Sequence, residues 1–277
     1  MTKSRDALSA NGVDAAFLEA QLLACHALGV DRSWLFAHGE DIAPIKILDP
    51  LLARRMNHEP LAYIVGRREF YGRVFYVDPR VLIPRQETEL LVEFALDWIR
   101  PRQGNRPKVL DLGAGSGCIA ITVKCEFPQA DVVATDISEG ALDVARQNAN
   151  ALNVDIELVL SDMFAGLGDR QFDLILSNPP YIALSESLAE EVVGYEPRLA
   201  LFSGQTGLEL YERLAKEGAS HLSSDGRLAV EVGYRQAISV AHIFTEHGWL
   251  HVGTMKDLGG IDRTVLFERA KRTPNDS

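Results

Sequence analysis

Four consecutive residues have the types and the spacing to do chemistry: Asn178, Pro179, Pro180 and Tyr181. They follow an apolar run, residues 172–177, that is typical of a buried parallel strand. Two successive prolines then take the chain out of the sheet in a stiff, extended loop. Asn178 and Pro179 offer carbonyl oxygens and Tyr181 offers an aromatic face, so two fixed acceptors can hold a planar –NH2 group and aim its nitrogen at an electrophile. The tetrapeptide favours chemistry on an amide or aryl amine, although alone it would equally suit a loop that ends a strand.

A glycine-rich loop upstream also follows an apolar strand, residues 109–112, and leads into a helix-like stretch. The loop consists of Gly113, Ala114, Gly115, Ser116 and Gly117. Glycines there let the backbone approach a ligand at the start of the helix. The spacing is not that of a dinucleotide loop, because Cys118 stands where that pattern has its third glycine. Asp111, just before the loop, suits the ammonium group of a ligand better than a pyrophosphate.

Two further strand ends each deliver a carboxylate. Asp136 ends a strand at residues 131–135, where a carboxylate is placed to bind paired ribose hydroxyls. Asp162 follows the strand at residues 156–160 and is either an acceptor for an adenine amine or an aspartate that makes a turn. An amino acid, a ribose and an adenine without phosphates make up S-adenosylmethionine. The strand ends together predict an S-adenosylmethionine-dependent methyltransferase, and the histidines and cysteines show no spacing of a metal site.

The composition of the chain sets limits on its partners and location. With 277 residues, 47% of them hydrophobic, it can bury one large core plus a small second domain. A net charge of −11 argues against stable nucleic-acid binding and suits a basic protein partner. There is no apolar run long enough to span a membrane and no signal sequence, and three cysteines indicate a reducing compartment. We therefore expect a cytoplasmic protein that does not bind membranes.

The N-terminal region has the pattern of a small helical unit. Residues 14–55 predict helices, because apolar residues recur there at helical spacing. One helix is expected over residues 16–28, closed by Gly29, and another over residues 45–55, which has arginines in its last turn.

The rest of the chain changes to a strand pattern. Residues 67–77, aromatic and β-branched around Gly72, predict a hairpin. From Lys108 onward strands and helices alternate, which predicts a doubly wound α/β sheet. Near the C-terminus, residues 249–252 and 264–267 favour an antiparallel hairpin that closes the sheet.

Two segments ahead of the glycine-rich loop carry a resemblance to a known family. Residues 68–72, Arg-Glu-Phe-Tyr-Gly, and 82–89, Leu-Ile-Pro-Arg-Gln-Glu-Thr-Glu, together with the tetrapeptide at 178–181, resemble the release-factor glutamine methyltransferases, the HemK/PrmC family. The resemblance covers essentially the whole chain and implies a seven-stranded, Rossmann-like methyltransferase core with a C-terminal antiparallel hairpin. It implies three parts: 1–66, a helical domain that docks the release factor; 67–80, a connecting β-hairpin; and 81–277, the methyltransferase domain.

The same resemblance implies a reaction and a set of site residues. The substrate is the glutamine of the Gly-Gly-Gln motif of class I peptide-chain release factors, whose methylation on N5 modulates translation termination. S-adenosylmethionine is the methyl donor, S-adenosylhomocysteine is the product, and the enzyme is expected to be a monomer. Cofactor contacts fall on residues 113–117, Asp136 and Asn178, and a tryptophan common in the family falls on Met163. The strand-end argument adds Asp162 to the expected cofactor contacts. Catalysis is expected of Asn178, Pro179 and Tyr181, and substrate binding of these residues with Pro180 and Phe70.

Several alternatives remain open at this point. A nucleic-acid amino-methyltransferase would flip an adenine or guanine into the same pocket, and a non-catalytic S-adenosylmethionine-binding protein is a second rival. Phe70 either walls the glutamine pocket or packs between domains. Arg85 and Glu87 either order the loop over the cofactor or begin a helix, and Glu231 is at least as well explained by buried pairing as by catalysis. The N-terminal helices either dock the release factor or only cover the catalytic core.

Overall fold

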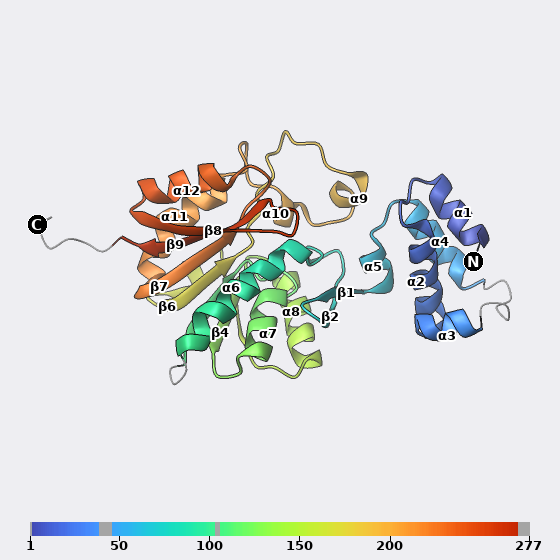
Figure 1. Cartoon of the computed structure of the whole chain (residues 1–277), viewed down its shortest axis with the longest axis horizontal. Coiled ribbons are helices and arrows are strands. Elements are labelled where there is room, and N and C mark those ends of the chain that lie inside the picture. The colour runs from blue at the N-terminus through green and yellow to red at the C-terminus, as the bar shows by residue number, and fades with distance from the viewer. Residues whose placement is uncertain (1, 39–45, 103–105, 271–277) are drawn as a thin grey trace, which may run out of the picture. The chain divides into compact units, whose positions relative to one another are not determined.

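The chain divides into two compact units. The computed structural model describes residues 2–38, 46–102 and 106–270 (Figure 1). One unit comprises Met1–Arg67 with Leu188–Glu196, and the other comprises Arg68–Ser187 with Pro197–Ser277. Ile45, expected in the first turn of a helix, lies outside the described residues. Within those residues, no helix has both the length and the apolar character needed to cross a membrane.

The first unit is made of short helices around one apolar cluster. Its helices are α1 (Thr2–Ala10), α2 (Ala16–Leu28), α3 (Arg32–Ala37), α4 (Leu48–Met56), α5 (Leu61–Val65) and α9 (Glu190–Val193). The helix predicted over residues 16–28 is confirmed, and Gly29 closes it with a left-handed φ of 68° that a residue without Cβ adopts freely. Helix α1 was not anticipated, because its composition is polar and it buries only Leu8. The cluster joins Leu8 to apolar residues of the other helices, including Leu23 and Leu52.

A segment from the middle of the chain belongs to this helical unit. Arg55 on α4 is buried, and its guanidinium pairs with Glu19 on α2 at 2.5 Å and with Glu191 on α9 at 3.0 Å. The hydroxyl of Tyr195 also donates to the backbone carbonyl of Asn57 at 2.6 Å. A buried arginine requires such partners, because an unpaired charge would be costly there. These contacts therefore explain why residues 188–196 pack with helices more than a hundred positions earlier.

The second unit contains a seven-stranded mixed sheet of order β5-β4-β3-β6-β7-β9-β8. Its strands are β3 (Lys108–Leu112), β4 (Asp131–Asp136), β5 (Glu157–Leu160), β6 (Phe172–Ser177), β7 (Leu222–Glu231), β8 (Trp249–Lys256) and β9 (Asp262–Arg269). Strands β3 to β7 run parallel to one another, whereas β9 runs antiparallel to both β7 and β8. The predicted doubly wound sheet and its closing antiparallel hairpin are confirmed.

Helices cover both faces of this sheet (Figure 1). Helices α6 (Glu89–Ile99), α7 (Cys118–Glu126) and α8 (Glu139–Ala151) lie on one face, and α11 (Glu209–His221) and α12 (Ala237–Glu246) lie on the other. Alternate strand residues enter different apolar clusters: Leu174 and Leu176 pack with α6 and α7, whereas Ile175 packs with α11 and α12. The remaining short helices are α10 (Arg198–Leu201) and the 3₁₀ turns η1 (Gln86–Thr88), η2 (Arg100–Arg102) and η3 (Ala165–Leu167).

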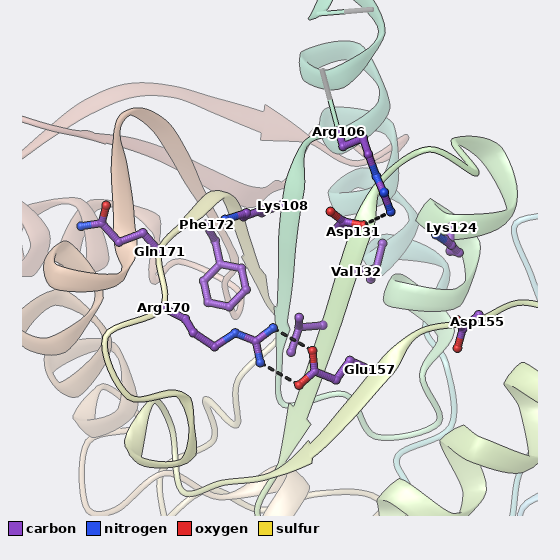
Figure 2. Close-up of a pocket in the computed structure, with 11 residues that line it drawn as sticks. Arg106, Lys108, Lys124, Asp131, Val132, Asp155, Glu157, Arg170, Gln171 and Phe172 are labelled. Carbon is purple, nitrogen blue, oxygen red and sulfur yellow. Dashed lines mark hydrogen bonds and ion pairs between the residues drawn. The ribbon is translucent and has the colours of Figure 1, made fainter. Parts of the chain in front are cut away.

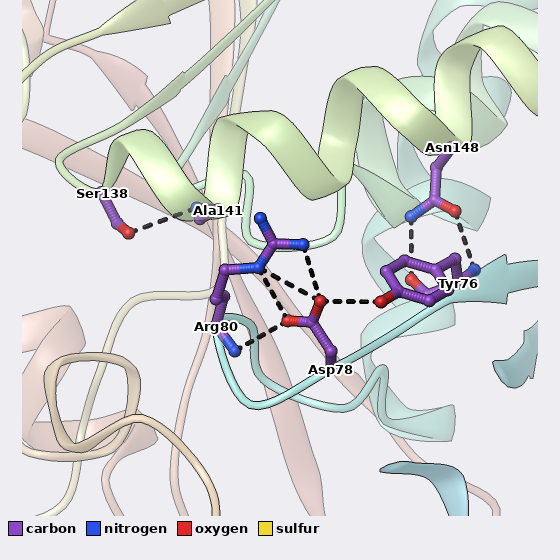
Figure 3. Close-up of polar contacts among 6 residues, drawn as sticks. All are labelled: Tyr76, Asp78, Arg80, Ser138, Ala141 and Asn148. Atoms are coloured by element: carbon purple, nitrogen blue, oxygen red, sulfur yellow. Dashed lines mark hydrogen bonds and ion pairs between the residues drawn. The ribbon is translucent and has the colours of Figure 1, made fainter. Parts of the chain in front are cut away.

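The predicted hairpin is present as β1 (Arg67–Phe70) and β2 (Arg73–Tyr76), and Asn148 on α8 holds β2 in place. The Asn148 carbonyl accepts from the backbone N–H of Tyr76 at 2.7 Å, and its amide group donates to the Tyr76 carbonyl at 3.0 Å (Figure 3). The same amide group donates to the carbonyl of Ser116 in the glycine-rich loop at 2.9 Å. A single buried side chain thus ties the hairpin to the loop.

Candidate active site

A cavity of about 480 Å³ lies at the carboxyl ends of the parallel strands. The loops after β3 and β6 both reach it, and these adjacent strands are where the strand order reverses. Open α/β sheets bind their ligands at such a switch point. The cavity is lined mainly by residues of the 80–88, 112–119, 135–141 and 161–163 segments, with residues 177–180, 197–200, Leu210 and Arg213.

The glycine-rich loop forms one wall of this cavity. Gly113 and Gly115 have φ values of 85° and 54°, and a Cβ built on either would meet no heavy atom within 4 Å. Gly117 differs, because a Cβ there would lie 2.8 Å from Ile121 and 3.1 Å from Ala145. Gly113, Ala114, Gly115 and Ser116 line the cavity, and Gly117 does not. The first two glycines therefore leave open room beside the loop, whereas Gly117 permits close helix packing.

Asp136 lies at the end of β4, beside the loop. One of its carboxylate oxygens accepts from the backbone N–H of Gly115 and the other from that of Ser138, both at 2.9 Å. Burial raises the pKa of Asp136, and these backbone donors oppose the rise. Because a carboxylate has about four acceptor positions, Asp136 keeps capacity for a further donor beyond the backbone N–H groups of Gly115, Ser138 and Ile137. Asp136 lines the cavity, so that capacity is available to a ligand.

Asp111 lies beneath the loop and does not line the cavity. Its side chain is fully buried, with one oxygen accepting from the backbone N–H of Ala120 at 3.0 Å. The other oxygen, Oδ1, has no hydrogen-bond partner among the described residues. Burial raises the pKa of Asp111 to about 7, and the nearby charge of Asp136 adds to the rise. Asp111 thus supports the first turn of α7 from inside, instead of facing the cavity as its sequence position suggested.

Asp162 and Met163 line the opposite wall. The Asp162 carboxylate pairs with Arg213 on α11 at 2.9 Å, and both side chains are substantially exposed. Met163 has a left-handed φ of 53° and packs against the apolar cluster under α11 and α12. The structure therefore brings both predicted residues to the cavity, and gives Asp162 an ion-pair partner that the sequence did not suggest.

The Asn178 tetrapeptide enters the cavity with three of its four residues: Asn178, Pro179 and Pro180. The amide group of Asn178 donates to the hydroxyl of Thr88 at 3.0 Å. No described residue is hydrogen-bonded to the side-chain carbonyl of Asn178. The carbonyl is thus left as an acceptor at the cavity, which is the role that the motif predicts for it.

Tyr181 is not among the lining residues. Its backbone carbonyl accepts from the side chain of Gln236 at 2.9 Å, and its ring lies so close to Gly233 that a Cβ there would come within 2.9 Å of it. Burial raises the pKa of the Tyr181 hydroxyl to about 12, and the nearby Glu231 adds to the rise. Its expected contact with substrate remains a prediction.

Phe70 is also absent from the lining. Its side chain is buried beside Phe75, with the ring planes at 80° and the centroids 6.0 Å apart. It belongs to the apolar cluster that includes α6 and α7. The structure shows Phe70 packed in an apolar cluster. Its expected contact with substrate remains a prediction.

Thr88 and Arg80 are among the residues at the cavity that the sequence analysis did not identify. Thr88 was quoted only within a segment that carries the family resemblance. Arg80 is held by Asp78, whose carboxylate also accepts from the hydroxyl of Tyr76 at 2.9 Å (Figure 3). Its aliphatic stem lies over Gly140, where a Cβ would come within 3.1 Å of Arg80. No local periodicity marks either position: Thr88 meets Asn178 ninety positions later, and the stem of Arg80 packs over Gly140.

A second hollow, of about 540 Å³, lies at the amino ends of the same strands (Figure 2). Its charged side chains largely satisfy one another: Arg170 pairs with Glu157 at 2.7 Å and Arg106 with Asp131 at 2.6 Å. Ligands of open α/β sheets bind at the other end of the strands, so we assign the site to the cavity at the carboxyl ends.

Comparisons with known proteins cover both the N-terminal and the later part of the chain. A family model described as the PrmC N-terminal domain matches residues 1–66, and one described as the methyltransferase small domain matches residues 87–194. The release factor glutamine methyltransferase of Bordetella pertussis is 42% identical over 270 residues, which cover 95% of this chain and 98% of that protein. The chain belongs to the release factor glutamine methyltransferase family. The resemblance inferred from residues 68–72 and 82–89 is therefore confirmed.

Other similar proteins are longer than this chain or share only its fold. The bifunctional methyltransferase of Rickettsia conorii is 37% identical over 96% of this chain, which spans only 56% of that protein. The chain thus covers about half the length of the Rickettsia relatives that it matches. A methyltransferase structure from Pyrococcus furiosus superimposes with a TM-score of 0.53 at 19% identity, covering 79% of this chain and 97% of that one. That similarity concerns the fold alone.

Proposed function

We propose that the chain transfers a methyl group from S-adenosylmethionine to the side-chain amide nitrogen of the glutamine in the Gly-Gly-Gln motif of peptide-chain release factors. One observation carries the proposal: the Asn178 amide uses its N–H side on Thr88 and presents an acceptor at a cavity that the glycine-rich loop also lines. An acceptor carbonyl beside a ligand cavity suits an –NH2 group as the second substrate. Two relatives of similar length are named release factor glutamine methyltransferases.

The residues that line the cavity fit S-adenosylmethionine. Its volume lies within the usual range for sites of small ligands, about 300–1,000 Å³. Gly113 and Gly115 leave open space for backbone approach, Asp136 keeps acceptor capacity for a ribose hydroxyl, and Met163 can cover an apolar ring face. When bound, S-adenosylmethionine supplies a methyl group on a positively charged sulfur.

The residues of the chain then contribute orientation and electrostatics. The carbonyls of Asn178 and Pro179 accept the two hydrogens of the glutamine amide and direct its nitrogen into the cavity. Pro179 has no N–H that could compete for the amide oxygen. The proline pair keeps the loop extended, so the two acceptors stay fixed relative to each other. No general base is required of the chain, because an amide nitrogen becomes far more acidic once it is alkylated and releases its proton readily.

The helical unit is the proposed docking surface for the release factor. A lone glutamine side chain offers too little surface for selectivity, and the chain is acidic, with a net charge of −11, which favours encounter with a basic partner. A soluble chain that begins near Glu69 should bind S-adenosylmethionine, as measured by calorimetry, yet methylate intact release factor poorly. A short Gly-Gly-Gln peptide should be a weak substrate for both chains. Equal activity of the two chains on release factor would mean that the helices only stabilise the core.

The reaction itself is tested by mass spectrometry of the release factor's Gly-Gly-Gln peptide. Incubation with the full chain and S-adenosylmethionine should add the mass of one methylene group to the glutamine. The matched control is the Asn178→Ala chain, which should leave the peptide unchanged. The alternative of a nucleic-acid amino-methyltransferase is tested with labelled S-adenosylmethionine on DNA and RNA. Methylation of nucleic acid in place of release factor would refute the proposal.

A further inference from the structure

The backbone carbonyl of Tyr181 is held by a side chain from the loop after β7. The amide group of Gln236 donates to this carbonyl at 2.9 Å, and its oxygen accepts from the backbone N–H of Gly233 at 3.0 Å. The Gln236 amide has only one orientation here, because a backbone N–H must face its oxygen and a backbone carbonyl must face its –NH2 group. Gln236 therefore bridges the end of the Asn178 tetrapeptide to the loop that follows β7.

The turn that presents Gln236 is built closely around Tyr181. Gln236 donates its backbone N–H to the carbonyl of Gly233 at 3.1 Å. Arg235, inside the turn, has a left-handed φ of 65°, which is unfavourable for a residue with a side chain. A Cβ at Gly233 would come within 2.9 Å of the Tyr181 ring. Strained backbone conformations gather at functional sites, and this one lies next to the side chain that holds the motif.

A glycine confines the same carbonyl. Gly207 lies in the segment that leads into α11, and its φ is 77°. A Cβ at Gly207 would overlap the Tyr181 carbonyl oxygen and come within 3.1 Å of the backbone nitrogen of Ala183. Because both atoms belong to the backbone, neither yields as the end of a flexible side chain does. A side chain at position 207 would therefore displace Tyr181 or its own segment.

Hydrogen bonds fix the segment that carries Gly207. The backbone N–H of Ile182 donates to the carbonyl of Leu201 at 3.1 Å, and that of Ser203 donates to the carbonyl of Ile182 at 2.9 Å. The Glu209 carboxylate accepts from two backbone N–H groups of this segment, at 2.7 and 2.9 Å. The segment is thus tied to the chain directly after the tetrapeptide, and Gly207 is held beside it.

The tetrapeptide is a stiff segment between two held ends. It starts after β6, where the Ser177 hydroxyl donates to the carbonyl of Leu112 at 2.7 Å, and it ends at Tyr181. Between these ends the rings of Pro179 and Pro180 fix two φ angles, and a residue that precedes a proline is restricted as well. The direction of the Pro179 carbonyl therefore depends on where Tyr181 is held.

From these contacts we infer that Gln236 and Gly207 are positioning residues, which hold the Tyr181 carbonyl and so aim the Pro179 carbonyl at the amide of the substrate. They touch neither substrate nor methyl donor in this role. The inference rests on the proposed function, in which the Pro179 carbonyl is the second acceptor. Because that acceptor is a backbone atom, no substitution removes it, and only the residues that hold it can be changed.

The first test compares Gln236→Glu with Gln236→Met in the full chain, with release factor and S-adenosylmethionine as substrates. Gln236→Glu keeps the acceptor for Gly233 and places a carboxylate oxygen, in place of the –NH2 donor, against the Tyr181 carbonyl. Gln236→Met has a similar length and makes neither bond. Both should lower kcat by about ten- to a hundredfold, as expected when orientation fails. The KM for S-adenosylmethionine and the calorimetric affinity for S-adenosylhomocysteine should stay close to those of the unchanged chain.

The second test compares Gly207→Ala with Gly248→Ala. Both glycines have a left-handed φ, 77° and 80°, so both substitutions strain the backbone. The new Cβ would meet backbone atoms at position 207, whereas at Gly248 no heavy atom lies within 4 Å. Gly207→Ala should therefore lower kcat by about tenfold or more, and Gly248→Ala should leave kcat unchanged. Since both should lower the melting temperature, a loss of kcat confined to Gly207→Ala separates positioning from general destabilisation.

Crystal structures of the variants separate this inference from the proposed function. In Gln236→Glu and in Gly207→Ala, residues 179–181 should be displaced while the glycine-rich loop keeps its place. Full kcat in folded Gln236→Glu or Gly207→Ala would overturn the inference, as would an undisplaced tetrapeptide or an equal loss of kcat in Gly248→Ala. An unchanged chain that methylates no release factor would refute the proposed function, whereas the crystal structures would still decide what holds Tyr181.

Discussion

Asn148 and Asn178 are both held by hydrogen bonds within the second unit, yet their amides are used in opposite ways. Asn148 is buried, and its carbonyl and amide groups together make three hydrogen bonds to backbone atoms of Tyr76 and Ser116. Asn178 is half-buried and uses only its N–H side, on Thr88. A fully satisfied amide can only hold structure, whereas one with a carbonyl left at a cavity can also bind a ligand. The difference separates an asparagine that holds the fold from the one that we propose takes part in the reaction.

The largest effect is expected from removing the Asn148 amide, which makes three hydrogen bonds to the backbone. Asn148→Ala should leave two carbonyls and one N–H unpaired in a buried place, and should lower the free energy of unfolding by about 3 kcal/mol. Urea denaturation measures the change. The control is Asn150→Ala, an exposed asparagine on the same helix, which should change stability little. Equal effects of the two substitutions would show that the three bonds of Asn148 contribute nothing net.

Removing the Asn178 amide, which is hydrogen-bonded through its N–H side, should lower turnover without lowering the free energy of unfolding. Asn178→Ala should lower kcat by about a hundredfold or more, equivalent to about 2.7 kcal/mol of transition-state free energy, because the glutamine amide loses an acceptor that fixes its nitrogen. Steady-state kinetics with release factor measures this loss, and urea denaturation should show little change. Near-normal turnover would show that Asn178 only ends a strand and takes no part in catalysis.

A smaller effect is expected at Asp136, which we propose binds S-adenosylmethionine equally in the ground state and the transition state. Asp136→Ala should weaken S-adenosylmethionine binding by about tenfold and raise KM with little change in kcat. Isothermal calorimetry measures the affinity. Asp143→Ala serves as the control, because that carboxylate lies on exposed α8 surface and pairs with Arg146 on the same helix. An unchanged affinity in Asp136→Ala would remove this residue from the cofactor site.

The smallest effect is expected at Asp162, whose exposed pair with Arg213 should contribute less than about 1 kcal/mol to stability. Asp162→Asn keeps an acceptor oxygen and should bind S-adenosylmethionine almost as well as the unchanged chain. Asp162→Ala removes the acceptor, and should bind a few-fold more weakly if Asp162 contacts the adenine amine, as measured by the same calorimetry. Identical affinities for the two variants would assign Asp162 to the ion pair alone.

The sequence by itself determined the strand ends and the chemistry that they carry. Apolar runs bounded by Gly113 and by Asn178 are local signals, since a buried parallel strand needs continuous apolar residues and a turn needs glycine or proline. The alternation of strands and helices also limits the fold to a few topologies, so the doubly wound sheet and its closing hairpin were predictable. The helix over residues 16–28 was predictable for the same reason, because its period and its closing Gly29 are local.

Only the tertiary structure decided which side of the Asn178 amide faces the cavity and which residue holds it. Thr88 lies ninety positions away, and an asparagine side chain has no orientation of its own until a donor or acceptor is placed beside it. The same holds for Arg55, whose burial required carboxylates from α2 and from the distant segment 188–196. Such partners are set by packing between elements far apart in the chain, and neither periodicity nor composition records them.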